Sequence, residues 1–317
     1  MWYALGVLNT WLTKQLGLEI PIIGAPMGGR AGGLLAGEVS RAGGLGMLGA
    51  ARYTTPEWVA AEAAIARRVG GSFGVGLMSW ALDDDDALLT AALAEKPALV
   101  SLSFGDPAPY VDRVKDAGAL VVSQVSTVED MAVAEAAGVD AIVAQGTEAG
   151  GHTGRIATLT LLQEVLEATR LPVLAAGGIA TGRGLAAVLA AGAHGAFVGT
   201  ALLASPETTG PEYAIGRLLA ARSTDTVYTD VFDKARHQPW PARWFGRAIV
   251  NNLSDKFDGA GASEDEIADV YDPADPDCGV VYAGQAAGLV TASRPVFEVV
   301  KNIAHDAEKQ LTRVCGM

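Results

Sequence analysis

The chain alternates short, continuously apolar runs with segments of helical pattern. Eight six-residue runs have this character: 20–25, 44–49, 73–78, 98–103, 119–124, 140–145, 172–177 and 195–200. Strands of a parallel sheet that is covered on both faces lose the alternation of polar and apolar residues, so these runs predict parallel strands. Eight of them separated by helices predict an α/β fold, a TIM (β/α)8 barrel.

Signals for helix ends fall between these runs. Thr55 stands before Pro56, and Thr181 stands before another helical segment, so both threonines are predicted N-caps. Ser126 and Glu129 have the spacing of a capping box. An Ala-Gly pair ends four helical segments just before a strand, at 42–43, 117–118, 137–138 and 191–192. These helix-end signals support repeated helix-strand units.

The pattern divides the chain into three parts. Residues 1–205 are predicted to form the barrel. Residues 206–280, rich in aromatic, proline and acidic residues, predict a smaller, mostly helical lobe over the active face, called the lobe below. Residues 281–317 return to the barrel and end in a helix that packs on it. The alternative is a doubly wound sheet, which requires a G-x-G-x-x-G turn after the first strand, where this chain has GAPMGG.

Charge and composition restrict the partners. The net charge of −13 would repel nucleic acid and anionic membrane surfaces, so neither is predicted as a partner. The two cysteines, Cys278 and Cys315, are too few for a disulfide framework or a zinc cluster. No metal-ligand spacing, basic leader or apolar run of about 18 residues occurs. We expect a cytoplasmic protein without a metal site.

The loops after the last two predicted strands have the composition of a phosphate site. In a TIM barrel the active site lies at the carboxyl ends of the strands, and the last two strand ends often bind phosphate through backbone N–H groups. Gly177, Gly178, Gly199 and Thr200 stand at these two ends. We therefore predict that they bind a phosphate.

The stretch QGTEAGGHTGR, residues 145–155, follows the sixth predicted strand. Gly150 and Gly151 would let the backbone approach a flat cofactor or its phosphate, because a Cβ there would collide with it. Gln145 offers an amide donor and an acceptor to a ring edge. His152 can exchange a proton near neutral pH or donate a hydrogen bond to an anion, which makes it the predicted catalytic residue.

Two other classes of function remain as alternatives. A phosphosugar enzyme would need a lysine or a pair of carboxylates at the strand ends, whereas this chain has uncharged side chains there: Met27, Met78, Ser103, Gln124 and Gln145. A non-catalytic binding protein would have a pocket filled by side chains rather than glycine loops. The uncharged strand ends favour a planar ring as the ligand.

Several motifs resemble those of the nitronate monooxygenase family and of the flavin-dependent enoyl-ACP reductases that share its fold. They include PIIGAPMGG, AGGLGMLGA, QGTEAGGHTGR, PVLAAGGIATGRG, FVGTALLAS and, near the end, YAGQAAGLV. The resemblance implies an FMN-binding TIM barrel with a lobe over the flavin. It implies FMN contacts for Ala25, Pro26, Met27, Gln124, Gln145, Gly150, Gly177, Gly178, Phe197, Val198, Gly199, Thr200 and Gln285.

The resemblance also implies a reaction. Family members oxidise a nitronate or nitroalkane with O₂ to a carbonyl compound and nitrite, and His152 would orient the nitronate oxygens or remove the α-proton. The alternative is an NAD(P)H-dependent FMN reductase of an enoyl thioester or a quinone. Many members have asparagine where this chain has Gly76, so a side-chain amide near the flavin is missing. The expected partners are a small-molecule substrate and O₂, with a homodimer as the possible assembly.

Overall fold

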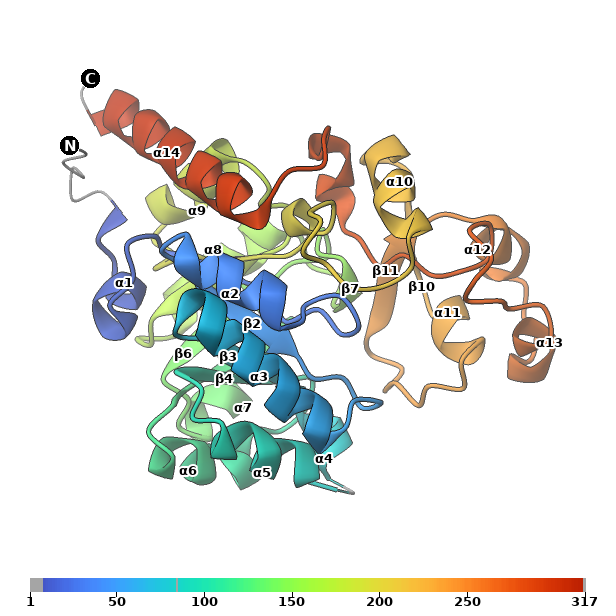
Figure 1. Cartoon of the computed structure of the whole chain (residues 1–317), viewed down its shortest axis with the longest axis horizontal. Helices are drawn as coiled ribbons and strands as arrows, with labels where there is room; N and C mark the ends of the chain where they lie inside the picture. Colours follow the sequence, from blue (N-terminus) through green and yellow to red (C-terminus); the bar gives the residue numbers. More distant parts are fainter. Residues whose placement is uncertain (1–7, 84, 316–317) are drawn as a thin grey trace.

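The eight predicted strands close into a parallel barrel in the computed structural model, which describes residues 8–83 and 85–315 (Figure 1). The barrel strands are β1 (Ile22–Gly24), β2 (Leu45–Gly49), β3 (Gly74–Met78), β4 (Leu99–Ser103), β5 (Leu120–Val125), β6 (Ala141–Gln145), β8 (Val173–Ala176) and β9 (Ala196–Val198). They pair in this order, and β1 pairs with β9 to close the barrel. The TIM barrel prediction is confirmed.

Helices surround the barrel and precede it. They are α1 (Trp11–Leu16), α2 (Gly33–Arg41), α3 (Pro56–Gly70), α4 (Ser79–Leu82), α5 (Ala87–Ala94), α6 (Ala108–Asp116), α7 (Val128–Ala136), α8 (Thr158–Ala168), α9 (Gly182–Ala190) and the 3₁₀ turn η2 (Thr200–Leu202). Thr55 and Thr181 cap α3 and α9, as predicted.

The predicted capping box at Ser126 and Glu129 is wrong by one residue. Thr127 is the N-cap of α7, because its backbone is extended and its side chain accepts from the N–H of Asp130. The Asp130 carboxylate in turn accepts from the N–H of Ser126, at 3.1 Å. The N3 carboxylate therefore bonds the residue before the N-cap, and no reciprocal capping box forms at Thr127.

Side chains fill the barrel interior, so the barrel is a packed core and not a pore. Ile23, Met47, Leu99, Val143 and Phe197 are among the buried residues of this inner cluster. A second, larger cluster lies between the strands and the surrounding helices. Because the interior is closed by this packing, a ligand can enter only beyond the strand ends.

The lobe contains helices and an antiparallel sheet that the sequence did not predict. Its elements are α10 (Tyr213–Ala220), β10 (Thr226–Thr229), α11 (Val231–Lys234), β11 (Phe245–Ile249), α12 (Asn252–Phe257) and α13 (Glu264–Ala268). The sheet order is β10-β11-β7, and its third strand, β7 (Gly151–Thr153), follows barrel strand β6 in the chain. Figure 1 shows this sheet between the barrel and α11 to α13.

Residues after the lobe return to the barrel. Tyr282 forms an isolated antiparallel bridge with Ala248 of β11. The 3₁₀ turn η3 (Gln285–Leu289) follows, and α14 (Val296–Cys315) then lies along α9 and α2 (Figure 1). No helix in the described part of the chain has the length and apolar character needed to cross a bilayer.

Candidate active site

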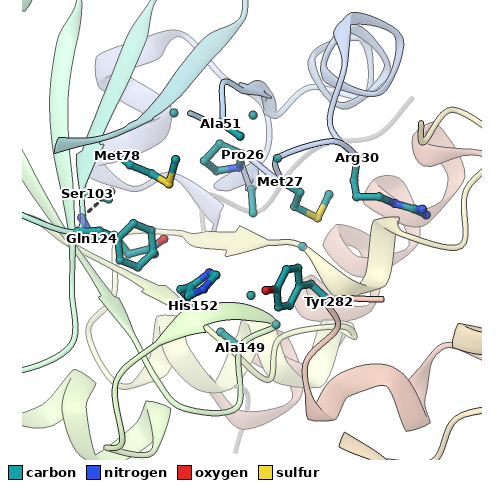
Figure 2. A pocket seen from close by; sticks show the side chains of 18 of the residues that line it. Pro26, Met27, Arg30, Ala51, Met78, Ser103, Gln124, Ala149, His152 and Tyr282 are labelled. Carbon is teal, nitrogen blue, oxygen red and sulfur yellow. Dashed lines mark hydrogen bonds between the residues drawn. The ribbon is translucent and has the colours of Figure 1, made fainter. Parts of the chain in front are cut away.

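A cavity of about 340 Å³ lies at the carboxyl ends of the barrel strands, under the lobe. Most of the predicted site residues line it: Ala25, Pro26, Met27, Gln124, Gln145, Gly150, His152, Gly177, Gly178, Phe197, Gly199 and Thr200. Figure 2 shows Met27, Met78 and His152 around one shared space. The volume is within the range of small-molecule and cofactor sites.

Val198 and Gln285 do not line the cavity. Val198 belongs to the cluster between the barrel and its helices, since side chains alternate along β9 and the inward position is taken by Phe197. Gln285 begins η3 with an exposed side chain, and Ala286 contributes to the lining instead. The structure therefore gives neither residue a side-chain contact with the cavity.

His152 projects from β7 into a closely packed position. The side chain is 6% exposed, and its Nε2 lies 2.7 Å from Oδ2 of Asp233. Its ring stacks on Trp240 with 3.4 Å between centroids and 7° between planes. Burial lowers the pKa of His152, and the Asp233 carboxylate opposes this only in part. At neutral pH the imidazole is therefore uncharged and able to accept a proton.

Asp233 is the centre of a buried hydrogen-bond network. The hydroxyl of Tyr282 donates to Asp233 Oδ1 at 3.0 Å, and the Arg236 guanidinium donates to the same oxygen at 3.2 Å. Arg236 also donates to the Tyr282 oxygen at 2.8 Å. Burial raises the pKa of Tyr282 well above its usual range, so its hydroxyl stays protonated. The lobe and the return segment thus both hold the partner of His152.

Aromatic side chains form the wall beside His152. Trp240 packs edge-on against Trp80 and Phe104, with 5.2 Å between ring centroids in each pair. Phe104 also meets Trp244 at 5.5 Å. Phe104 has a left-handed backbone, with φ of 62°, which places its ring in this cluster at some conformational cost. These rings shield the imidazole from bulk water.

The glycines beside His152 are also required by the protein's own packing and backbone conformation. A Cβ on Gly150 would lie 2.5 Å from the Gly284 nitrogen, so the backbone here closely approaches the return segment. Gly151 has open space around it but needs φ of +74°. The two glycines are therefore required for separate reasons, one steric and one conformational.

Gly76 is explained by its neighbour. A Cβ at this position would lie 2.3 Å from Cβ of Pro26, whose ring fills the space that a side chain would need. Both residues line the cavity. A side chain at position 76, such as the amide of asparagine, would therefore require Pro26, just after β1, to move.

Uncharged polar side chains form the floor of the cavity. Ser101 and Ser103 share a hydrogen bond of 2.8 Å, and Ser103 also accepts from the N–H of Gln124 (Figure 2). Oε1 of Gln145 is buried and has no partner among the described residues. A buried unpaired acceptor is costly, so this oxygen is suited to a ligand that donates a hydrogen bond.

Comparison with known proteins identifies the family. The model of the nitronate monooxygenase family matches residues 80–306. The chain belongs to the nitronate monooxygenase family. A curated nitronate monooxygenase from Paraburkholderia phytofirmans is 31% identical, with 96% of each chain covered.

Other similar proteins are named for other activities. A (3aS,4S,5R,7aS)-5-hydroxy-7a-methyl-1-oxo-octahydro-1H-indene-4-carboxyl-CoA dehydrogenase from Mycobacterium tuberculosis is 37% identical, covering 73% of this chain and 66% of that protein. The match therefore spans slightly under two thirds of that relative. FabK from Thermotoga maritima has a similar structure, with a TM-score of 0.86, 28% identity, and coverage of 97% of this chain and 98% of that one. This family member is thus an oxidoreductase, and its relatives are named for different activities.

Sequence reasoning missed Asp233, Arg236 and Tyr282. Asp233 is 81 positions from His152 and lies on a helix of four residues, so no spacing or periodicity connected the two. Tyr282 is the first residue of the recognised YAGQAAGLV stretch, but the resemblance implied no role for its side chain. In this nitronate monooxygenase family member, only the folded lobe and return segment bring these residues to the imidazole.

Proposed function

We propose that this protein is an FMN-dependent nitronate monooxygenase, which oxidises nitronates or nitroalkanes with O₂ to carbonyl compounds and nitrite. The observation that carries the proposal is a buried His152, paired with Asp233, that lines a cavity with an uncharged polar floor. Its placement suits proton exchange with a weakly acidic carbon. We propose a cytoplasmic location, which the low cysteine content supports.

The cavity residues fit FMN. The unpaired Oε1 of Gln145 is an acceptor for an N–H of the flavin ring, and the glycines at the ends of β8 and β9 leave backbone N–H groups for its phosphate. Gly177 and Gly178 have φ of 101° and 73°, which favour glycine. The Thr200 hydroxyl accepts from the N–H of Gly284 and can still donate to a phosphate oxygen.

The charge of the cavity favours an anionic substrate. Its described lining includes Arg30, Arg52 and Arg236 but no aspartate or glutamate, although acidic residues outnumber basic ones in the chain. A nitronate is an anion, and arginines beside it lower its free energy in the site. The bound FMN would supply the electron acceptor for the substrate carbon, with O₂ as the final oxidant.

The protein residues would bind the substrate and move its proton. His152 would accept the α-proton of a nitroalkane, or donate a hydrogen bond to the oxygens of a nitronate. Trp240, Trp80 and Phe104 would exclude water beside it. Water exclusion strengthens the electrostatic contacts made inside the cavity.

A second candidate is an NAD(P)H-dependent FMN reductase of an enoyl thioester. The likeness to FabK over nearly the whole chain supports it, as does the CoA ester in the name of the mycobacterial relative. The same three arginines would then face an anionic carrier. Both candidates require FMN and differ in the source of electrons.

Anaerobic flavin reduction separates the two. The purified protein would be loaded with FMN and mixed, without O₂, with propionate 3-nitronate, NADH or NADPH. We expect loss of the oxidised flavin absorbance with the nitronate and slow or no loss with either nicotinamide. Rapid bleaching by NADH or NADPH alone would favour the reductase, and failure to bind FMN would refute both candidates.

The His152→Ala variant tests the assigned base. We expect it to retain FMN, because the contacts proposed for the ring and phosphate come from other residues. Its turnover should fall by roughly 10²–10⁴, the usual contribution of a general base. Turnover equal to that of the wild type would remove His152 from the reaction.

A further inference from the structure

The two ring nitrogens of His152 have different surroundings. Nε2 is committed to Asp233 at 2.7 Å. Nδ1 has no hydrogen-bond partner among the described residues, and protein atoms do not enclose it completely. Because His152 lines the cavity, Nδ1 is the nitrogen available to a ligand. Which nitrogen carries the proton therefore decides whether the ligand meets an acceptor or a donor.

The partners of Asp233 define the direction of its bond to His152. Oδ1 already accepts hydrogen bonds from the Tyr282 hydroxyl and from the cationic Arg236, so the carboxylate acts as an acceptor on that side. An ionised carboxylate can only accept hydrogen bonds. Nε2 must therefore carry the proton that it shares with Oδ2, and Nδ1 is left with a free lone pair.

Backbone hydrogen bonds also hold Asp233 in place. Its N–H donates to the Asp230 carbonyl at 3.0 Å, and its own carbonyl accepts from the N–H of Gln238 at 2.9 Å. The side chain is 6% exposed. A carboxylate held in this way can set both the orientation and the tautomer of a neighbouring imidazole.

We propose that Asp233 is a positioning residue, which holds His152 with its proton on Nε2 and so makes Nδ1 the atom that takes the α-proton. This rests on the proposed function. In the step, the substrate Cα–H bond breaks and an Nδ1–H bond forms. The electron pair of the broken bond stays on the substrate as the nitronate, so no oxidant is needed. The imidazolium is then balanced by the Asp233 carboxylate.

The Asp233→Asn variant tests this inference through activity. The asparagine amide has nearly the same shape, but its NH₂ group can donate to Nε2 and move the imidazole proton to Nδ1. We expect kcat/KM with a nitroalkane to fall by about 10²–10⁴ with FMN retained. The matched control is Asp230→Asn, on the same segment, whose side chain pairs with Lys234 and is 35% exposed. It should keep wild-type activity.

The pH profile gives a readout that a merely structural role would not change. The described titratable groups that face His152 are Asp233, Arg236 and Tyr282. Loss of the Asp233 charge removes the group that raises the pKa of His152, so the acid limb of kcat/KM should move to lower pH in the residual activity of Asp233→Asn. An unchanged limb with activity within three-fold of wild type would overturn the proposal.

Nitrogen NMR decides the tautomer without any turnover. In protein labelled at its four histidines, the His152 signals are assigned by their absence in His152→Gln. We expect a directly bonded proton on Nε2 and none on Nδ1 in the wild type, and the reverse in Asp233→Asn. A proton on Nδ1 in the wild type would overturn the proposal. Failure of the nitronate and nicotinamide assays, with the expected tautomer present, would instead refute the proposed function alone.

Discussion

Gly150 is the position where one added methyl group should have the clearest effect. In Gly150→Ala the new Cβ would lie 2.5 Å from the nitrogen of Gly284 and 2.6 Å from the carbonyl carbon of Ala283. Both are backbone atoms, which cannot move aside as a flexible side chain would. Ordinary carbon contacts begin near 3.4 Å, so one of the two segments must shift by about 0.9 Å.

The expected cost follows from the contacts in that region. Overpacking of a well-packed site costs about 1–3 kcal/mol. The shift also strains two hydrogen bonds of the return segment, from Gly284 N–H to Thr200 Oγ1 at 3.0 Å and from Gln285 N–H to the Glu148 carbonyl at 2.9 Å. Each contributes about 1 kcal/mol. We expect Gly150→Ala to lower the free energy of unfolding by about 3 kcal/mol.

Gly151→Ala is the matched control, since the same methyl group is added one residue away. No atom lies within 4 Å of its Cβ, but its φ of +74° is strained for alanine. That strain costs about 1 kcal/mol. At an unfolding entropy of about 2.1 cal/mol/K per residue, the expected falls in Tm are about 4.5 °C for Gly150→Ala and about 1.5 °C for Gly151→Ala.

The assay is calorimetric unfolding of flavin-free protein, so that neither variant is affected by cofactor binding. A Tm for Gly150→Ala equal to or above that of Gly151→Ala would refute the steric argument. It would show that the backbone of the return segment moves away from the added methyl group with little loss of unfolding free energy. The result does not depend on the proposed reaction.

Three further predictions concern the site. Because burial lowers the pKa of His152, kcat/KM should be flat at neutral pH and fall only below about pH 6.5. On acidification the histidine of the unfolded chain binds a proton before that of the folded chain, so the free energy of unfolding should also fall through that range. Trp240→Ala removes the ring stacked on His152, and we expect a loss of about 1–3 kcal/mol in thermal unfolding together with lower kcat. Arg52→Gln should raise KM for propionate 3-nitronate roughly ten-fold and leave KM for a neutral nitroalkane unchanged; equal KM changes would contradict the anion-binding role.

The barrel could be predicted because each strand carries its own signal. All eight apolar runs became strands within two residues of the expected ends, since burial on both faces makes a strand continuously apolar. The cavity positions followed from the rule that strand ends form the active site. The side chain of Val198 lies outside the cavity because side chains alternate along β9, a feature that the motif resemblance did not include.

The lobe could not be predicted to the same degree because its order depends on distant pairing. β7 is three residues long and glycine-containing, and it becomes a strand only because β11 lies beside it. Asp233 reaches His152 through the same arrangement. Neither relation leaves a local pattern in the chain, so the hydrogen-bond partner of the catalytic histidine was found only in the folded structure.

The pairing of β7 with β11 determines how the lobe can be exchanged in protein engineering. His152 lies opposite Gly246 in that ladder, although its chain position places it within the barrel sequence. A chimera that joins this barrel to a relative's lobe at residue 206 would leave one strand of the sheet with a foreign neighbour. Residues 151–153 should therefore be transplanted together with the lobe, as one recombination block made of two separate chain segments.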